Sequence, residues 1–469
     1  MVFSSLPFIF FILPLFLILD LCFRKSVLLR NISLILVSLF FYVFDGGMHS
    51  LKILLAYGLL NLVFGYILET VKEKRSYLKN FVLILFVSIN LLALVFYKYF
   101  YWIIGLFHQS GLLLSVNAKV QSLPLGISFF TFHAISYLID ISRNQLSGKC
   151  KITTFLAYFF MFPHLIAGPI VRFKDVKDDL NSRVDSHSLF NYGLYRFILG
   201  LNKKILIANS VAPLADMAFL FNVNSISTMD AWIGALAYMI QIYFDFSAYS
   251  DMAIGLAAMA GFRFHENFNS PYKATSIQDF WRRWHMSLSS WLRDYVYIPL
   301  GGSRVASYRI YFNLVFVFFL CGLWHGANMT FVLWGLYNGL FLILERLFLK
   351  DVLFKLPKVL THFYALIVVL VGWVIFRADS VDHALEYLKV MFSISNIDNV
   401  SLVEGKILNY AALIAGFLVI FFNLSSFSSS DAYEQKTHTT AYVFHALLVF
   451  GSVVILYFNA QNPFIYFNF

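Results

Sequence analysis

Long apolar runs follow one another along the whole chain, and they restrict the fold more than any other feature of the sequence. Of the 469 residues, 60% are hydrophobic and only 13% are charged, about half the charged share of an ordinary soluble domain. A soluble fold could not bury this much apolar surface, so the lipid bilayer must act as part of the solvent. The runs lie near 7–23, 28–44, 50–71, 81–107, 124–141, 152–170, 190–221, 230–261, 310–345, 360–376, 408–424 and 441–458.

These runs predict an all-α polytopic membrane protein, because helices with internally satisfied backbones are the usual way to cross a bilayer. At about 20 residues for each crossing, we expect roughly ten to twelve transmembrane helices. No internal repeat, low-complexity linker or soluble domain of useful size separates them. We therefore expect residues 1–469 to form a single membrane-embedded domain.

The net charge of +10 has a simple explanation in a membrane protein, where Lys and Arg gather in cytoplasmic loops. Nucleic acid is therefore not an expected partner, whereas membrane lipids are. A basic cytosolic surface would also suit an anionic substrate such as a nucleotide thioester. Cys22, Cys150 and Cys321 form no CxxC motif, so neither a zinc site nor a disulfide framework is expected.

Charged loops predict the orientation of the first spans. The N-terminal run is apolar up to Leu19, and the first basic residues, Arg24 and Lys25, follow it. A secretory signal has the opposite charge order, so this run is expected to be a retained span with its N-terminus outside. Basic loops near 24–30, which includes Arg30, near 72–80 and near 143–151 are expected in the cytoplasm, and the acidic loop 378–406 outside.

The run 152–170 does not fit this alternation, because basic residues from Arg172 onward follow a loop that is already assigned to the cytoplasm. Pro163, Gly168 and Pro169 within the run favour a broken or re-entrant helix. Irregular backbone at membrane depth must be buried in protein or line a wet cavity. The number of crossings near 152–190 stays open at this stage.

The segment 262–309 holds seven basic and three acidic residues, a local excess of +4, and is expected at the cytoplasmic side. Ser276 and Asp279 resemble a capping box, so an amphipathic helix is expected from about Ile277 to Tyr297. His285 lies on its apolar face, while Arg282 and Arg293 lie mostly on the opposite face. The competing interpretation is a packed histidine with a local partner. The apolar face also carries Trp281, Trp284, Leu288, Trp291, Leu292 and Tyr295.

Asp245 and Asp251 lie in or near an apolar span. Intramembrane carboxylates are costly and usually face a protein interior or a cavity. The alternative is that the span ends there, close to the membrane surface. Both interpretations remain open from the residues alone.

His325 is the strongest candidate for chemistry. Ile310 to Leu344 are 35 residues without Asp, Glu, Lys or Arg, which as one helix would extend ~52 Å across a hydrocarbon core of ~30 Å. Two pieces are therefore expected, joined near 321–328, where Gly322 and Gly326 weaken the helix. His325 would line a cavity there and suits a general base. Cys321, one turn earlier, allows a Cys–His pair, although a small buried residue is the better interpretation.

Several sequence motifs lie along most of the chain. They are Met1-Val-Phe-Ser-Ser, Phe129-Phe-Thr-Phe-His-Ala-Ile-Ser-Tyr-Leu-Ile-Asp140, Pro163-His-Leu-Ile-Ala-Gly-Pro169, Tyr243-Phe-Asp-Phe-Ser-Ala-Tyr-Ser-Asp251, Asp279-Phe-Trp-Arg-Arg-Trp-His-Met-Ser-Leu-Ser-Ser-Trp-Leu-Arg-Asp-Tyr295, Tyr297-Ile-Pro-Leu-Gly-Gly302, Leu323-Trp-His-Gly-Ala-Asn328, Gly372-Trp-Val-Ile-Phe-Arg377 and the tail Phe464-Ile-Tyr-Phe. Taken together, these motifs resemble the membrane-bound O-acyltransferase family. The likeness is closest to its bacterial polysaccharide-modifying branch, typified by the membrane subunit of alginate O-acetylation.

The resemblance implies a ring of tilted helices, some re-entrant or broken, around a central tunnel. It places the catalytic histidine on His325 and a second signature histidine on His285, and gives His133 and His164 no catalytic role. It also implies a bacterial inner-membrane enzyme that binds no permanent cofactor and uses an acyl-CoA donor, expected to be acetyl-CoA. An extracytoplasmic acetyltransferase partner would carry the acyl group to a polysaccharide acceptor.

The remaining candidates have supporting roles in this hypothesis. Arg282, Arg283 and Arg293 would gather the CoA phosphates, and Asp245 or Asp251 would order a polar network. Trp324 and Asn328 flank His325 in its motif. Two rival functions stay open: a lipid or protein O-acyltransferase of the same family, and a glycan transporter without chemistry. The sequence fixes neither the acceptor nor the oligomeric state.

Overall fold

The computed structural model describes residues 2–71, 76–109, 123–146, 150–220, 225–393, 405–422 and 439–458. In these ranges the regular elements are helices and no strand occurs, which confirms the all-α prediction. The basic loops 72–80 and 143–151, the acidic loop 378–406 and the neutral loop near 108–122 lie partly or wholly outside the described residues, as does the tail motif 464–467. Their sidedness therefore stays a prediction.

Six helical segments are long and apolar enough to cross a membrane, and four shorter apolar helices accompany them among the described residues. The protein is therefore a multi-pass membrane protein, as predicted. The long segments are Val27–Val71, Ser76–His108, His187–Leu220, Ser307–His325, Met329–Lys355 and Lys358–Arg377, and the shorter ones are Phe8–Cys22, Ile127–Ser142, Ile407–Phe421 and Leu447–Tyr457.

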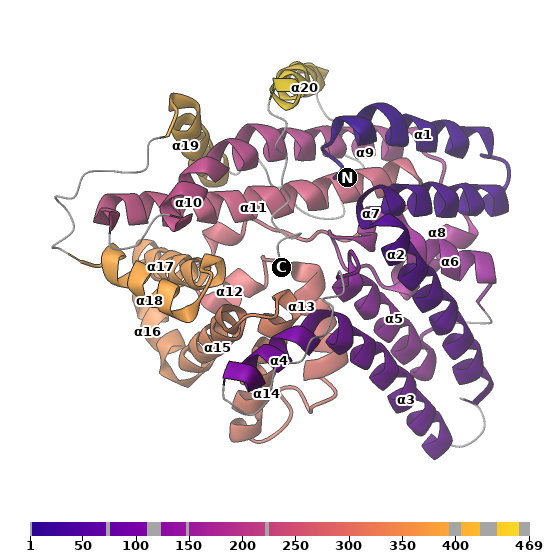
Figure 1. The fold of residues 1–469 in the computed structure, drawn as a ribbon, viewed down its shortest axis with the longest axis horizontal. Helices are drawn as coiled ribbons and strands as arrows, with labels where there is room; N and C mark the ends of the chain where they lie inside the picture. Colours follow the sequence, from indigo (N-terminus) through magenta and orange to yellow (C-terminus); the bar gives the residue numbers. More distant parts are fainter. Residues whose placement is uncertain are drawn as a thin grey trace. The chain divides into compact units, whose positions relative to one another are not determined.

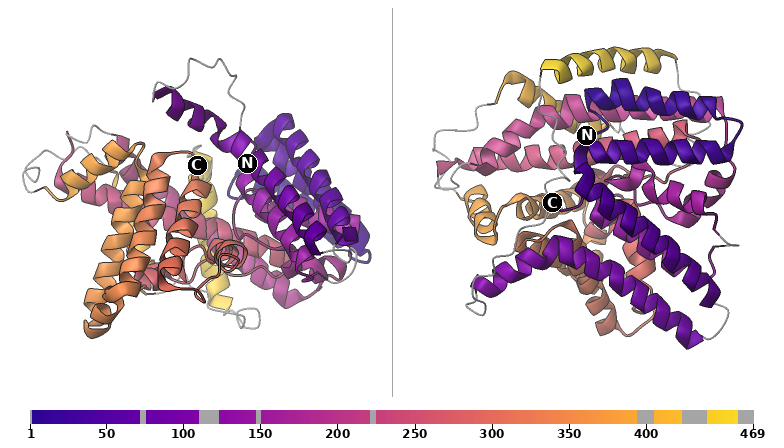
Figure 2. Two further views of the ribbon diagram at one scale, coloured as in Figure 1. Left: turned by 90° about the horizontal axis from the view of Figure 1, so that it is seen from below. Right: turned by 45° about the vertical axis from the view of Figure 1, so that its right-hand side comes forward.

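The chain divides into two compact units, one made of residues 1–197 and 250–265 and the other of 198–249 and 266–469. Figure 1 labels the helices of both. Within the first unit α2, α3 and α5 pack side by side (Figure 2). Its elements are η1 (Phe8–Ile12), α1 (Leu13–Cys22), α2 (Val27–Val71), α3 (Ser76–Leu94), η2 (Val95–Tyr99), α4 (Phe100–Gln109), α5 (Ile127–Ser142), α6 (Ile152–Phe160), α7 (Phe162–Leu165), α8 (Phe173–Asn181) and most of α9 (His187–Asn202).

Two predicted spans, 28–44 and 50–71, join in α2 across a kink at Gly47. The φ of Gly47 is 67°, a left-handed conformation that glycine adopts without the steric strain of other residues. Arg30, expected in the preceding loop, instead lies inside α2 and is buried. Its guanidinium donates to both carboxylate oxygens of Asp20 in α1, at 2.8 and 2.6 Å. Pairing with a carboxylate explains how a charged side chain is accommodated inside the unit.

The predicted break in the run 152–170 is confirmed. Helix α6 ends at Phe160, Met161 leaves helical geometry with a ψ of 112°, and α7 has only four residues. At 1.5 Å per residue, the nine residues of α6 extend ~14 Å, about half of the hydrocarbon thickness. This stretch therefore does not cross the membrane as one helix.

The second unit carries the predicted chemistry. Helix α11 runs through both units, and its residues 228–249 belong to this one. The elements are η3 (Lys203–Asn209), α10 (Ser210–Leu220), α11 (Thr228–Met259), η5 (Pro271–Lys273), α12 (Ile277–Trp281), α13 (Met286–Leu292), η6 (Arg293–Tyr297), α14 (Ser307–His325), α15 (Met329–Leu344), η7 (Glu345–Leu349), α16 (Lys350–Lys355), α17 (Lys358–Arg377), α18 (Val381–Met391), α19 (Ile407–Phe421) and α20 (Thr439–Phe458).

Helices α14 and α15 are the two pieces expected from the uncharged stretch 310–344, and they pack against each other along their length. Glycines make this close approach possible. A Cβ on Gly322 would collide with the carbonyl of Phe331, and one on Gly335 with the carbonyl of Phe318. The backbones can therefore approach closely only because both positions lack a side chain.

Candidate active site

His325 is the last residue of α14, and the helix breaks directly after it, as predicted. Gly326 is extended, with a φ of −170°, and Asn328 caps α15 by accepting a hydrogen bond from the Thr330 backbone N–H at 3.1 Å. The amide of Asn328 also donates to the carbonyl of Asp379 at 2.9 Å. Asn328 thus fixes the loop that follows His325 and ties this loop to the residues just after α17.

Aromatic rings enclose the imidazole of His325, which is 5% exposed. The indole of Trp334 is perpendicular to it at a centroid distance of 5.1 Å, and Phe376 lies at the same distance with an angle of 82°. Trp324 contacts it at 5.0 Å. Three large rings therefore restrict the orientation of the imidazole.

The single helix predicted for 277–297 is wrong. Helix α12 ends at Trp281, a turn follows, and α13 begins at Met286 with His285 in the left-handed region at φ 43° and ψ 53°. Asn267 stabilises the break, because its side-chain oxygen accepts from the backbone N–H and hydroxyl of Ser287, at 3.2 and 2.9 Å, and its carbonyl accepts from Met286 N–H at 2.9 Å.

His285 is fully buried, as its place on the apolar face predicted. Its ring contacts Phe246 edge-on at 4.6 Å and Trp324 at 5.8 Å. Burial lowers the pKa of His285 to about 3, because desolvation disfavours the imidazolium. The ring is therefore neutral at pH 7, and Trp324 contacts both this histidine and His325.

Side chains from η7 and α15 hold α12 in place. The capping hydrogen bond predicted at Ser276 is present, from Asp279 N–H at 3.0 Å. In addition, the buried carboxylate of Glu345 accepts from the backbone N–H groups of Ile277 and Gln278, at 2.5 and 3.0 Å. The indole of Trp281 donates to Asn338 at 3.2 Å. The segment that leads to His285 is thus attached to the part of the chain that carries Trp334.

Asp245 and Asp251 are both buried inside their units and both pair with a base. Asp245 lies 2.6 Å from Lys204 in the second unit. Asp251 belongs to the first unit, where Arg196 donates to it from Nε at 2.9 Å and from a terminal nitrogen at 2.6 Å. The interior interpretation of these carboxylates is therefore correct, and neither marks a span end at the surface.

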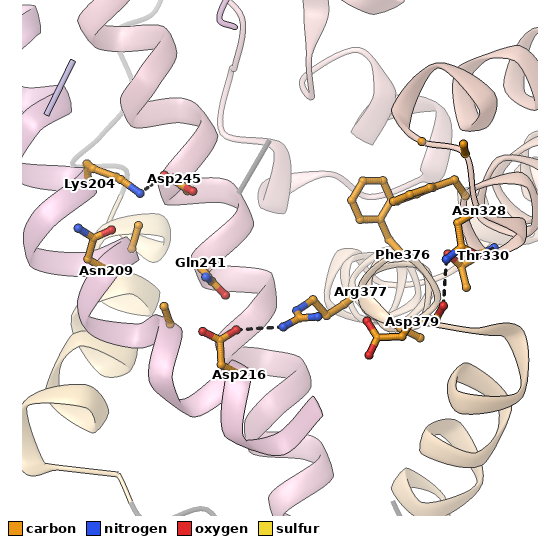
Figure 3. Close-up of a pocket in the computed structure, with 16 residues that line it drawn as sticks. Lys204, Asn209, Asp216, Gln241, Asp245, Asn328, Thr330, Phe376, Arg377 and Asp379 are labelled. Atoms are coloured by element: carbon orange, nitrogen blue, oxygen red, sulfur yellow. Dashed lines mark hydrogen bonds and ion pairs between the residues drawn. The ribbon is translucent and has the colours of Figure 1, made fainter. Parts of the chain in front are cut away.

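A polar cavity of about 500 Å³ lies in the second unit beside the break. Figure 3 shows Asp216, Gln241 and Arg377 on its walls, with an ion pair of 3.0 Å between Asp216 and Arg377. His325 does not itself line this cavity, contrary to the prediction, although Gly326 directly after it does. Phe376 lies between the two, because its ring both lines the cavity and contacts His325. The other lining residues are Lys204, Ala208, Asn209, Ala212, Asp245, Gly326, Ala327, Asn328, Thr330, Phe331, Ala378 and Asp379.

The three candidate arginines do not line this cavity. Arg282 is exposed, Arg293 pairs with Asp294 at 2.7 Å, and Arg283 pairs with Asp279 at 2.8 Å. Cys321 is buried at 3% exposure and also lies outside the lining.

His133 and His164 stack at 4.3 Å in the interior of the first unit, where His164 Nε2 hydrogen-bonds the carbonyl of Tyr158 at 2.8 Å. Both are fully buried, and neither lines the cavity. They are packed interior residues of that unit.

Comparison with known proteins fits this geometry. The profile of the membrane-bound O-acyltransferase family matches residues 114–382. The chain belongs to this family. His325, His285 and the cavity walls all fall within the matched region, and the protein is accordingly a membrane-embedded O-acyltransferase.

Curated relatives of this O-acyltransferase align over most of its length. It is 41% identical over 425 residues to the probable alginate O-acetylase AlgI of Azotobacter vinelandii, covering 90% of this chain and 84% of that protein. It is 37% identical over 493 residues to the probable alginate O-acetylase AlgI of Pseudomonas putida, covering both chains fully. The peptidoglycan O-acetyltransferase of Helicobacter pylori is 33% identical over 524 residues, covering 100% of this chain and 98% of that protein.

Several residues that line the cavity of this O-acyltransferase were not predicted from the sequence to have a role. Lys204 lies in the apolar run 190–221, and a basic residue at such depth could have indicated a buried acidic partner. Arg377 closes one of the quoted motifs but received no role. Gln241 and Thr330 gave no signal, because single polar residues within apolar runs are common.

Proposed function

We propose that the enzyme takes an acetyl group from cytosolic acetyl-CoA and moves it across the membrane for O-acetylation of an extracytoplasmic polysaccharide, through a partner acetyltransferase. The observation that carries the proposal is the position of His325, held by three aromatic rings at a helix break beside a polar cavity. The names of the relatives, alginate O-acetylase and peptidoglycan O-acetyltransferase, favour a glycan destination. The site of action is the inner membrane of a bacterial cell.

His325 acts as the general base. A ring nitrogen removes the proton from the acceptor hydroxyl while the hydroxyl oxygen attacks the carbonyl carbon of the thioester. A C–O ester bond forms, the C–S bond breaks, and the imidazolium returns its proton to the departing CoA thiolate. The reaction needs neither an acyl-enzyme nor Cys321, which lies outside the cavity lining.

His285 and Trp324 support the base. His285 is neutral at pH 7, since burial lowers its pKa to about 3, so it can hydrogen-bond or pack but supplies no positive charge. Trp324 contacts both imidazoles. We assign Trp324 the task of holding His325 at a fixed orientation to the segment 277–297, which faces the donor side.

The donor is recognised by charge. Arg282 and Arg293 are exposed, and with Arg283 they provide guanidinium groups for the phosphates of CoA. The buried pairs of Asp245 with Lys204 and of Asp251 with Arg196 keep charged groups neutralised inside each unit. Asn328 orders the loop after His325. No permanently bound cofactor takes part.

The experiment that tests this function follows labelled acetyl-CoA into membranes that contain the protein, with and without candidate glycans and a candidate extracytoplasmic acetyltransferase. We expect label in the glycan fraction only when the protein and an acetyl donor are both present. Label that appears only in membrane lipid would contradict the proposal and favour a lipid O-acyltransferase. Glycan movement without consumption of acetyl-CoA would favour a transporter.

A further inference from the structure

The connection between α15 and α17 extends beyond the hydrocarbon core of a membrane. The helical segment Met329–Lys355, which contains α15, η7 and α16, has 27 residues and extends ~40 Å, whereas the core is ~30 Å thick. Its last turns must therefore leave the core. Helix α17 begins at Lys358 and has 20 residues, enough for one crossing. Residues 346–358, the hairpin tip, thus lie at a membrane surface.

The hairpin tip is strongly basic. It contains four basic residues and one acidic residue, a net charge of +3, and all five side chains are exposed. Within the described part of the chain, none of the four basic side chains forms an ion pair or a hydrogen bond. Their charges are therefore available to an anion outside the protein. The five residues are Arg346, Lys350, Asp351, Lys355 and Lys358.

Large apolar side chains lie between these cations and are exposed as well. Phe354 is 92% exposed, and about half of the surface of Leu347, Phe348 and Val352 is exposed. Contact with water would be costly for so much apolar surface, whereas lipid chains accept it. A basic helix with exposed Phe and Leu side chains is typical of segments that lie in the headgroup region. The hairpin tip thus offers apolar contacts to acyl chains and cations to headgroups.

The other end of α17 is acidic. Arg377 at this end pairs with Asp216. The exposed carboxylates of Asp379, Asp382 and Glu386 follow. Because Lys and Arg gather on the cytoplasmic side of a membrane protein, this asymmetry favours the cytoplasmic leaflet for the hairpin tip. Anionic lipids give that leaflet a negative surface potential, which attracts basic clusters beside a span.

We propose that the hairpin tip is a binding site for anionic phospholipids of the cytoplasmic leaflet. The four cations bind the headgroup phosphates, and the exposed Phe, Leu and Val side chains lie among the acyl chains. Clusters of ~4–8 Lys and Arg directly beside a span are typical of sites for anionic lipids. A soluble phosphate would use the cations alone and leave the apolar side chains in water. The site does not depend on the identity of the acyl donor or acceptor.

The residue directly before the hairpin tip faces inward and holds α12. This residue is Glu345, whose carboxylate accepts from the backbone N–H groups of the first two residues of α12, at 2.5 and 3.0 Å. The hydroxyl of Tyr364 donates to the same carboxylate at 3.2 Å. A lipid that binds Arg346 and its neighbours restrains the chain at Glu345. Lipid binding therefore stabilises the first turn of α12, which leads to His285.

Lipid binding can be measured as a change in the Tm of the full chain in a neutral detergent. Phosphatidylglycerol should raise the Tm in a concentration-dependent manner, because a ligand of the folded state stabilises it, whereas zwitterionic phosphatidylcholine should not. Replacing all four cations of the hairpin tip with Gln, the tip variant, should abolish the shift. Lys350→Gln alone should weaken the apparent affinity for phosphatidylglycerol roughly fivefold. High salt should reduce the shift in wild type.

The link to α12 has its own readout, amide hydrogen exchange. Phosphatidylglycerol should slow exchange at Ile277 and Gln278, whose N–H groups Glu345 accepts, and this protection should be absent in the tip variant. Unchanged exchange in α12 on lipid binding would overturn the link and leave the lipid site itself standing.

A control variant removes four exposed cations elsewhere and so changes the net charge equally. It should keep the full response to phosphatidylglycerol. Equal responses of the tip variant and wild type would overturn the site at the hairpin tip. A rise in Tm of the same size with soluble glycerol phosphate would show that phosphate alone is sufficient and would overturn the lipid assignment. The residues that the control changes to Gln are Lys25, Lys52, Lys151 and Lys389.

Discussion

The indole of Trp324 contacts the imidazole of His285, with ring centroids 5.8 Å apart and planes inclined by 54°. Because Trp324 immediately precedes His325, this contact links the break after α14 with the separate break between α12 and α13. Two irregular points in the second unit thus support each other through one side chain. The contact therefore gives Trp324 a structural role between the two histidines.

Replacing Trp324 with Leu should reduce kcat far more than the KM for acetyl-CoA, because His325 loses a ring that fixes its orientation. A displacement of about 1 Å can cost on the order of 100-fold in rate. Trp291→Leu is the matched control, since Trp291 is also buried and packs on Tyr295. A Trp324 variant with wild-type kcat would show that the contact does not position the base.

Acidification should reveal the buried neutral state of His285. Its pKa is lowered to about 3 from an ordinary 6.5, so the unfolded chain binds a proton that the folded chain excludes. Folding stability contributed by the neutral ring is complete above about pH 6.5 and is lost as the pH falls toward 3. The Tm of wild type should therefore exceed that of His285→Gln at neutral pH, and this difference should shrink as the pH falls from about 6.5 toward 3.

The same lowered pKa sets an expectation for kinetics. Because His285 does not titrate between pH 5 and 8, His285→Gln should lower the rate but leave the shape of the pH–rate profile unchanged in that range. A profile whose midpoint moves in this variant would mean that His285 itself exchanges a proton during turnover.

Close packing of α14 and α15 predicts that Gly322→Val is strongly destabilising. An added side chain would collide with the carbonyl of Phe331, and overpacking a tight interface commonly costs about 1–3 kcal/mol, occasionally more. Gly105→Ala is the control, because a Cβ at Gly105 meets nothing within 4 Å. Thermal unfolding in detergent should show a lowered Tm for Gly322→Val and an unchanged or raised Tm for Gly105→Ala.

The pair of Lys204 and Asp245 predicts a non-additive double-mutant cycle. Removing one partner leaves a charge in the interior, which typically costs about 3–5 kcal/mol. Lys204→Met and Asp245→Leu should each destabilise the protein, while the double variant recovers much of the loss. Additive losses in unfolding free energy would indicate that the two charges, 2.6 Å apart, are not coupled.

The helix breaks could be predicted from the sequence, because bilayer thickness limits the length of a span and glycine and proline weaken a helix. An uncharged run longer than a bilayer has to break, and the glycines at 322 and 326 left few places for the break, so His325 could be placed at the end of a helix. The Pro and Gly residues between 163 and 169 predicted the interruption after α6 in the same way. For Asp245 and Asp251 the apolar surroundings allowed two interpretations, a protein interior or a span end at the surface, and the structure agrees with the first.

Other features depend on contacts between distant residues. The apolar periodicity of 277–297 continues through the turn at 282–285, so the pattern gave no indication of the break. What stabilises the break is Asn267, 20 residues before its partner Ser287. In the same way, the cavity brings together Gln241, Thr330 and Arg377 from three different helices, and no periodicity within one helix can reveal such a combination.

The role of His325 as the base is tested most directly by acetyl transfer in the His325→Ala variant. Membranes with equal amounts of folded wild type, His325→Ala and the control His187→Ala, whose histidine is exposed, are supplied with labelled acetyl-CoA, the partner acetyltransferase and the glycan acceptor. We expect full transfer by wild type and His187→Ala and none above background by His325→Ala. Normal acetylation by a folded His325→Ala protein would show that His325 is not the base.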